Sequence, residues 1–88
     1  MEDKQIIALL LRRAEQALAA LEQKYGRLLH KLAANILGDP EDAAECVNDT
    51  YLALWNTIPP ENPDPLSAYA CRVGTNIALT RLRHERAQ

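Results

Sequence analysis

The stretch ILGDPEDAAECVNDTYLALW, residues 36–55, decides how this chain folds. A strong helix boundary lies near its start, because Gly38 suits the left-handed conformation that often ends a helix and Asp39 can cap the next helix. Pro40 fits the first turn of that next helix, and the acidic residues after it complement the helix dipole. The stretch therefore predicts that one helix ends before Gly38 and another begins at Pro40.

The helix that begins at Pro40 is predicted to have two different faces. Its inward positions follow the three- and four-residue spacing of one helix face. They are Ala43, Val47, Thr50, Tyr51, Leu54 and Ile58. The opposite face holds Glu45, Asn48, Asp49, Leu52 and Asn56. We therefore expect an acidic outer face that carries one exposed leucine.

Upstream of this boundary, apolar periodicity predicts an amphipathic helix from about Glu15 to Leu37. Its expected core stripe consists of Leu18, Leu21, Tyr25, Leu28, Leu29, Leu32, Ala33 and Ile36. Asp3 can cap an earlier apolar segment, residues 6–11. Because no helix breaker separates the two segments, they could also form one long helix, bent or interrupted only near Gly26.

Downstream, four prolines between residues 59 and 65 end the helix and should hold residues 59–64 extended and stiff. A last helix is expected from about Pro65 toward Arg86. Its predicted inner face is Leu66, Tyr69, Ala70, Val73 and Ile77, and its outer face is Arg72, Thr75, Asn76, Leu79 and Arg83. Strand signals are absent, so the sequence predicts an all-α fold, a compact bundle of three to four helices forming a single domain over residues 1–88.

The charge of the chain is unevenly distributed, although the net charge is only -2. No basic residue lies between Lys31 and Arg72, a stretch rich in Asp and Glu, whereas arginines dominate from Arg72 onward. This polarity fits two partners of opposite charge, a basic protein surface and a nucleic-acid backbone. On charge alone, ordinary solvated helix faces explain it equally well.

Several functional classes find no support in the sequence. The chain lacks a Gly-rich phosphate loop, a nucleophile elbow and a metal-binding histidine pair, so we expect no enzyme activity, no cofactor and no metal site. Cys46 and Cys71 lack CxxC spacing and are expected to be small buried residues. No apolar run approaches the roughly 20 residues of a membrane span, and the start of the chain lacks a secretory signal. These features predict a cytoplasmic protein that does not bind membranes.

Residues 36–55, followed by YACRVGTNIALTRLR at residues 69–83, resemble the second conserved region of bacterial RNA polymerase sigma factors of the extracytoplasmic-function type. The two motifs occur in the order found in that family, and the resemblance covers nearly the whole chain. It implies a domain that docks on the clamp helices of the largest subunit of RNA polymerase core. It also implies recognition and melting of the promoter minus-ten element as single-stranded non-template DNA.

The resemblance assigns a polymerase-binding role to the acidic helix face. Asn48 and Asp49 match the Gln-Asp or Gln-Glu pair with which the family meets the clamp helices. Because that polymerase surface is basic in the family, Glu45 and Asp49 are the expected charge partners. Leu52 is the expected apolar contact.

The resemblance assigns a DNA-binding role to the last helix. Asn76 occupies the position of the asparagine that contacts the minus-ten element in the family, and Arg72 matches a neighbouring arginine. Arg81 and Arg83 match the basic tail. Tyr69 stands where many members have tryptophan, although it also fits the core stripe. Basic side chains can hold phosphates, while asparagine and aromatic groups can read or stack on unpaired bases.

In the family, the loop between these two helices forms a pocket for a flipped-out promoter base. Here that loop is residues 56–64, which are proline-rich and acidic and contain no arginine or aromatic residue, so base specificity cannot be assigned. The family also has a second DNA-binding domain, which reads the upstream promoter element, and we expect it to be absent because the chain ends before it. The resemblance leaves an anti-sigma factor open as a further partner.

Two other interpretations are compatible with the sequence. The chain could be a helical protein-interaction module without nucleic-acid binding, using the side of Leu52 and Trp55. It could also be a fragment of a helix-turn-helix repressor. The second reading is weaker, because a recognition helix follows a turn of about three to four residues, whereas this turn is long and proline-rich.

Overall fold

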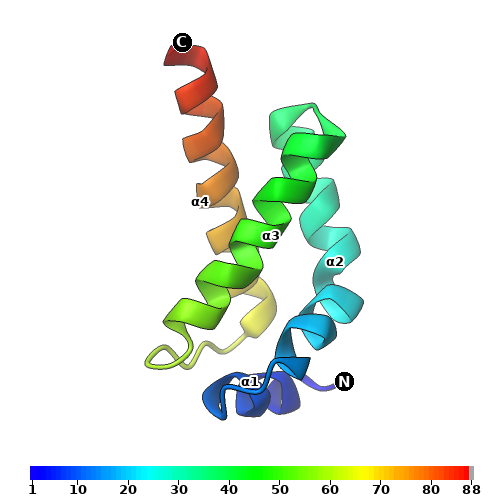
Figure 1. Cartoon of the computed structure of the whole chain (residues 1–88), viewed down its shortest axis with the longest axis vertical. Coiled ribbons are helices and arrows are strands. Elements are labelled where there is room, and N and C mark those ends of the chain that lie inside the picture. The colour runs from blue at the N-terminus through cyan, green and yellow to red at the C-terminus, as the bar shows by residue number, and fades with distance from the viewer. Residues whose placement is uncertain (88) are drawn as a thin grey trace.

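The computed structural model describes residues 1–87 and the side chains as far as Arg86. Within this range the chain forms four α-helices and no strand (Figure 1). They are α1 (Asp3–Leu11), α2 (Gln16–Leu37), α3 (Pro40–Thr57) and α4 (Leu66–Ala87). The predicted all-α bundle is confirmed.

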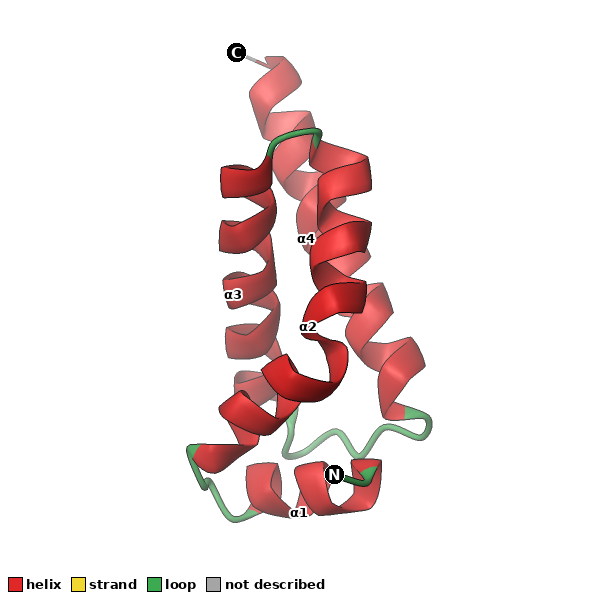
Figure 2. Cartoon of the chain, turned by 90° about the vertical axis from the view of Figure 1, so that its right-hand side faces the viewer, coloured by secondary structure: helices red, strands yellow, loops and turns green. Residues whose placement is uncertain are grey.

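The three long helices lie side by side and alternate in direction, and α1 lies across one end of the bundle (Figure 2). The bundle measures 40 × 23 × 20 Å. The C-terminal half of α4 lies beside the N-terminal half of α3, and the loop between α3 and α4 lies at the end that α1 covers. The two ends of α3 therefore have different neighbours.

The first two helices are separate, which settles the alternative that the sequence left open. Arg13 takes a φ of 58°, in the left-handed region that a helix cannot continue through. The chain then enters α2, which passes through Gly26 without interruption. The absent side chain of Gly26 makes room for the carboxylate of Glu22, which would lie only 2.9 Å from a Cβ at position 26. Glu22 in turn accepts a hydrogen bond from the Tyr51 hydroxyl of α3.

The expected capping role of Asp3 is wrong. The residue at the start of α1 is Glu2, whose backbone N–H donates to Oε1 of Gln5 at 3.0 Å. Asp3 lies in the first turn and instead accepts from Lys24 Nζ at 2.7 Å and from the Tyr25 hydroxyl at 2.5 Å. It therefore ties α1 to α2.

The predicted boundary between α2 and α3 is confirmed in detail. Gly38 has a φ of 73°, and Asp39 Oδ1 accepts from the backbone N–H of Glu41 at 2.7 Å and of Asp42 at 3.2 Å. All six inward positions predicted for α3 are buried. The cap sets where α3 begins, and the apolar stripe sets which side of it faces the core.

The predicted core stripes of α2 and α4 are partly wrong. Leu28 is 47% exposed, while the buried side of α2 consists of Ala17, Ala20, Leu21, Tyr25, Gly26, Leu29 and Ala33. On α4 the buried positions are Leu66, Ala70, Gly74 and Ala78, with Tyr69, Val73 and Ile77 half-buried beside them. Both helices bury small residues because these let the backbones approach closely.

Gly74 shows how close that approach is. A Cβ on Gly74 would lie 3.4 Å from Leu29 of α2 and 3.4 Å from the Thr50 hydroxyl of α3. The Cys46 thiol lies 3.7 Å from the Gly74 carbonyl and is buried as predicted, and burial raises its pKa. Cys71 is only half-buried, contrary to prediction.

The segment between α3 and α4 is not fully extended, contrary to prediction. It begins with a turn at residues 58–60, in which the Glu61 N–H donates to the Thr57 carbonyl at 2.8 Å. Only residues 61–63 lack a turn or bend. Among the described residues, no helix combines the length and apolar character needed to cross a bilayer.

Candidate functional site

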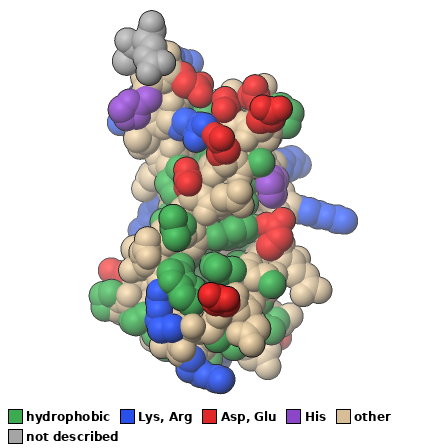
Figure 3. Space-filling model, in the orientation of Figure 1, with side chains coloured by type: hydrophobic (Ala, Val, Ile, Leu, Met, Phe, Trp, Pro, Cys, Tyr) green, Lys and Arg blue, Asp and Glu red, His purple; other side chains and the backbone are tan. Residues whose placement is uncertain are grey.

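The outer face of α3 presents the four residues expected to bind polymerase. We call Glu45, Asn48, Asp49 and Leu52 the α3 face; all four are exposed, and Leu52 is 58% exposed. Acidic side chains gather around the end of the bundle where α3 begins (Figure 3). The α3 face thus combines negative charge with one apolar side chain, as predicted.

The buried stripe of α3 and a hydrogen bond to α2 hold the rotation of α3 and therefore the direction of this face. Within α3, the buried Thr50 hydroxyl donates to the Cys46 carbonyl at 2.8 Å, so it needs no partner on another helix. The Tyr51 hydroxyl donates to Glu22 of α2. Burial raises the pKa of Tyr51, and the hydrogen bond to Glu22 raises it further, so the phenol stays a neutral donor.

The outer side of α4 carries the residues expected to bind DNA. Arg72, Asn76 and Arg83 are exposed. Tyr69 is half-buried, and its hydroxyl donates to Thr57 Oγ1 at 3.0 Å. The Arg72 guanidinium lies over the Tyr69 ring, 5.4 Å from its centroid. The ring is therefore held at its hydroxyl end and carries a cation on one face.

A hollow of about 400 Å³, which we call the loop hollow, lies where the α3–α4 loop meets α4. Its lining consists of Glu61, Pro63, Asp64, Pro65, Ala68, Tyr69 and Arg72. The expectation that this loop offers no aromatic or basic group to a base is correct for the loop itself. The hollow, however, also includes α4, which supplies the Tyr69 ring and the Arg72 guanidinium. Tyr69 and Arg72 were predicted to bind DNA but not to lie beside the loop; the available signal was that Tyr69 follows Pro65 by one helical turn.

Arg81 does not project freely from α4, although it was grouped with the DNA-binding residues. It donates to Glu45 and, at 3.4 Å, to Asp42 Oδ1, while its Nε lies 3.9 Å from Glu85 Oε1. Its side chain is only 29% exposed. The structure thus brings together Glu45 of the predicted polymerase site and Arg81 of the predicted DNA site. Within residues 1–87, no ion pair involves Arg72 or Arg83.

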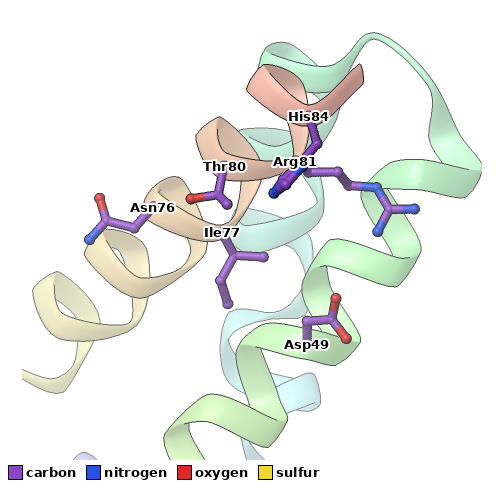
Figure 4. Close-up of a pocket in the computed structure, with 6 residues that line it drawn as sticks. All are labelled: Asp49, Asn76, Ile77, Thr80, Arg81 and His84. Carbon is purple, nitrogen blue, oxygen red and sulfur yellow. The ribbon is translucent and has the colours of Figure 1, made fainter. Parts of the chain in front are cut away.

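A groove between α3 and α4 runs along this contact. Its volume is about 420 Å³, and its lining is Asp49, Asn76, Ile77, Thr80, Arg81 and His84. Figure 4 shows Arg81 reaching from α4 toward α3, while Asn76 points away from α3. Asn76 therefore remains available to a ligand on the outer side of α4, and Arg81 does not share its direction.

No group of three or more His, Cys, Asp or Glu side chains among the described residues is arranged to hold a metal ion. The described surface offers instead three arrangements suited to macromolecules. These are an acidic helix face, a basic and polar helix face, and a hollow lined by an aromatic ring and a cation. An acidic face suits a basic protein surface, whereas the other two suit a phosphate backbone and an unpaired base.

Comparison with known proteins gives one match. The family model described as sigma-70 region 2 matches residues 21–88. A search of curated proteins finds no match to this chain, and a search of solved structures finds none. The matched range covers α2 from Leu21 onward together with α3 and α4, and leaves α1, its connection to α2 and the first turn of α2 outside.

Proposed function

Since the chain belongs to the sigma-70 region 2 family, whose members are non-enzymatic domains of transcription initiation factors, we propose that it joins polymerase core to promoter DNA through two separate surfaces. The α3 face docks on the clamp helices of the largest polymerase subunit. The outer side of α4, together with the loop hollow, recognises the melted minus-ten element. We assign the domain to the extracytoplasmic-function type on its two sequence motifs.

Support for docking comes from the composition and exposure of the α3 face. Glu45 and Asp49 provide the charge that a basic surface attracts, which speeds encounter and fixes orientation. Leu52 provides an exposed apolar group for the centre of the contact. Asn48 can donate and accept hydrogen bonds beside them.

Support for DNA recognition comes chiefly from the loop hollow, and this observation carries the proposal. A base that leaves its stack needs an aromatic surface and polar groups to receive it. Tyr69 offers its ring, and Arg72 offers a cation that can also reach a phosphate. Asn76 lies two turns further along α4 and is exposed to meet a second base edge.

The engagement of Arg81 suggests an order of events. In the free domain Arg81 is bound to carboxylates of α3, so fewer cations are available to DNA. The domain therefore gains its DNA affinity mainly after it has joined polymerase core. A basic clamp surface that binds Glu45 would compete with Arg81 for this carboxylate and release the guanidinium.

The proposal is tested by mixing the chain with polymerase core and then with single-stranded and double-stranded oligonucleotides. We expect binding to core, and preference of the complex for single-stranded non-template DNA over duplex. Asp49→Ala should weaken core binding, whereas Glu15→Gln, which changes an exposed acid at the start of α2, should not. Binding to core without any DNA preference would instead favour a protein-interaction module.

A further inference from the structure

Arg13 makes three contacts with the end of α3 from a distant part of the sequence. Its Nη1 donates to the Trp55 carbonyl at 2.7 Å and to the Ile58 carbonyl at 3.0 Å, across 42 and 45 residues. Its guanidinium carbon lies 3.9 Å from the centroid of the Trp55 ring. Arg13 lies in the connection between α1 and α2, outside the range matched by the family model.

These contacts answer a specific need of α3. The last carbonyls of a helix lack partners within the helix. The Trp55 carbonyl would normally accept from the residue four positions on, but that residue is Pro59, which has no N–H. The last turn of α3 contains no basic residue of its own. Arg13 supplies both the missing donor and the positive charge that the C-terminal end of a helix favours.

The contacts of Arg13 also determine where the loop starts. Residues 55–57 end the last turn of α3, and Ile58 is the C-cap that leads directly into the loop that borders the hollow. Arg13 holds this turn on one side. On the other side, Thr57 accepts the hydrogen bond from Tyr69, whose ring lines the hollow. A shift of this turn would therefore move both the loop and the support of the Tyr69 ring.

We propose that Arg13 is a positioning residue for promoter recognition. It does not contact DNA, but it fixes the last turn of α3. It thereby sets the width of the loop hollow and the position of the Tyr69 ring. The inference rests on the proposed function of that hollow. It predicts that base preference, and not polymerase affinity, depends on a residue from the α1–α2 connection, because the α3 face lies on earlier turns of α3.

The experiment compares wild type with Arg13→Ala, Arg13→Lys and Tyr25→Phe. Each chain is bound to polymerase core, and a single-stranded library with randomised minus-ten positions is then selected and sequenced. Tyr25→Phe is the matched control, because it removes the hydrogen bond to Asp3 and weakens the attachment of α1 to α2 without touching α3. Core affinity and the melting temperature are measured for every variant.

For Arg13→Ala we expect base discrimination to fall by about five- to tenfold, as when one positioning hydrogen-bond pair is lost. Core affinity should stay within about twofold. Arg13→Lys should recover discrimination in part, because an ammonium can donate to one carbonyl but lacks the flat guanidinium that stacks on Trp55. Tyr25→Phe should discriminate like wild type even if it melts earlier.

A second readout reports the contact itself. Trp55 is the only tryptophan in the chain, so its fluorescence in the free protein reports on the ring that Arg13 covers. Arg13→Ala should shift the emission to longer wavelength as water reaches the ring, and Tyr25→Phe should not.

Unchanged base preference in Arg13→Ala, beside a wild type that discriminates, would overturn the inference and leave the proposed function intact. Equal loss of discrimination in Tyr25→Phe would overturn it as well, because general loosening of α1 would then explain the effect. A wild-type complex that discriminates between no bases would overturn both the inference and the proposed DNA-reading function.

Discussion

The two ends of α3 are each held by an arginine from elsewhere in the chain, but the partners differ. At the N-terminal half, Arg81 of α4 binds the carboxylates of Asp42 and Glu45, which are side chains that water or a protein partner could also satisfy. At the C-terminal end, Arg13 binds backbone carbonyls that have no helical donor. The first contact is exchangeable, whereas the second is part of the scaffold.

This difference corresponds to the two proposed surfaces. The exchangeable contact involves Glu45 of the α3 face, for which a basic partner is expected to compete. The fixed contact lies beside the loop hollow, where a base needs walls that stay in place. An arginine can therefore act as a replaceable counter-ion or as a structural cap, depending on whether its acceptors have other partners.

The largest effect is expected from the core that sets the rotation of α3, on which both contacts depend. Leu54→Ala should destabilise the domain by about 2 to 4 kcal/mol, because a fully buried side chain is lost and its cavity fills incompletely. Leu52→Ala is the matched control, since this leucine lies on the exposed side of the same helix and should cost within about 0.5 kcal/mol. Urea denaturation measures both. Equal losses would mean that α3 is turned the other way.

The next largest effect separates the two arginines directly. Arg13→Ala should destabilise by about 1 to 2 kcal/mol, because two carbonyls lose a charged donor. Arg81→Ala should cost less than about 1 kcal/mol, as is usual for partly exposed ion pairs. High salt should shrink the effect of Arg81→Ala and leave most of that of Arg13→Ala. Urea denaturation at low and high salt checks this, and matching salt dependence would remove the distinction between the two contacts.

The sequence allowed the faces of α3 to be predicted because two independent signals agree there. The Gly38–Asp39–Pro40 boundary sets where the helix starts, and a regular apolar stripe sets its buried side. In α2 the hydrophobic ranking misled, since Leu28 is exposed while alanines such as Ala17 are buried. Leucine is the more apolar residue, but the close approach of helices selects small side chains, and that approach depends on the whole bundle.

The sequence allowed individual site residues to be predicted, but not the contacts that those residues make with one another. Exposure of the four residues of the α3 face follows from periodicity. The bond from Arg81 to Glu45 joins residues 36 apart, and the bond from Arg13 to Trp55 joins residues 42 apart. Such pairs meet only after the helices have packed at particular angles and registers. Arg81 was assigned to DNA because it matches the basic tail of the family's last helix, a match that carries no information about its carboxylate partners.

A smaller effect is expected where the exchangeable contact meets polymerase. Asp49→Ala and Asn48→Ala should each weaken core binding by roughly three- to tenfold, equivalent to about 0.7 to 1.4 kcal/mol. The melting temperature should not change, because both side chains are exposed. Titration of labelled chain with core measures the affinity. Native affinity for both variants would exclude the α3 face as the docking surface.

The salt dependence of DNA binding distinguishes Arg81 from Arg83, although the sequence predicts the same DNA-binding role for both. If Arg83 holds a phosphate, Arg83→Ala should reduce the salt slope of single-strand binding by about 0.7. In the free chain Arg81→Ala should leave the slope nearly unchanged, because Arg81 is occupied by carboxylates. In the complex with core, Arg81→Ala should reduce the slope like Arg83→Ala. An equal effect of both changes in the free chain would mean that the carboxylates do not withhold Arg81 from DNA.

The smallest effect is expected at Asp3, which forms a third charged contact by joining α1 to α2. Its hydrogen bond from Lys24 lowers the pKa of Asp3, and the hydrogen bond from Tyr25 lowers it further. A lowered pKa in the folded state means that the stabilisation is present above the unfolded pKa of about 3.9 and is lost as the pH falls through the folded value. Asp3→Asn should therefore reduce stability at neutral pH and flatten the acid limb of the stability curve below about pH 4. Glu15→Gln serves as the control for removing one carboxylate. Urea denaturation at several pH values below 5 measures the free energy of unfolding. If this free energy falls equally steeply with decreasing pH in Asp3→Asn and wild type, the charge of Asp3 does not contribute. Asp3 would then attach α1 through hydrogen-bond geometry alone.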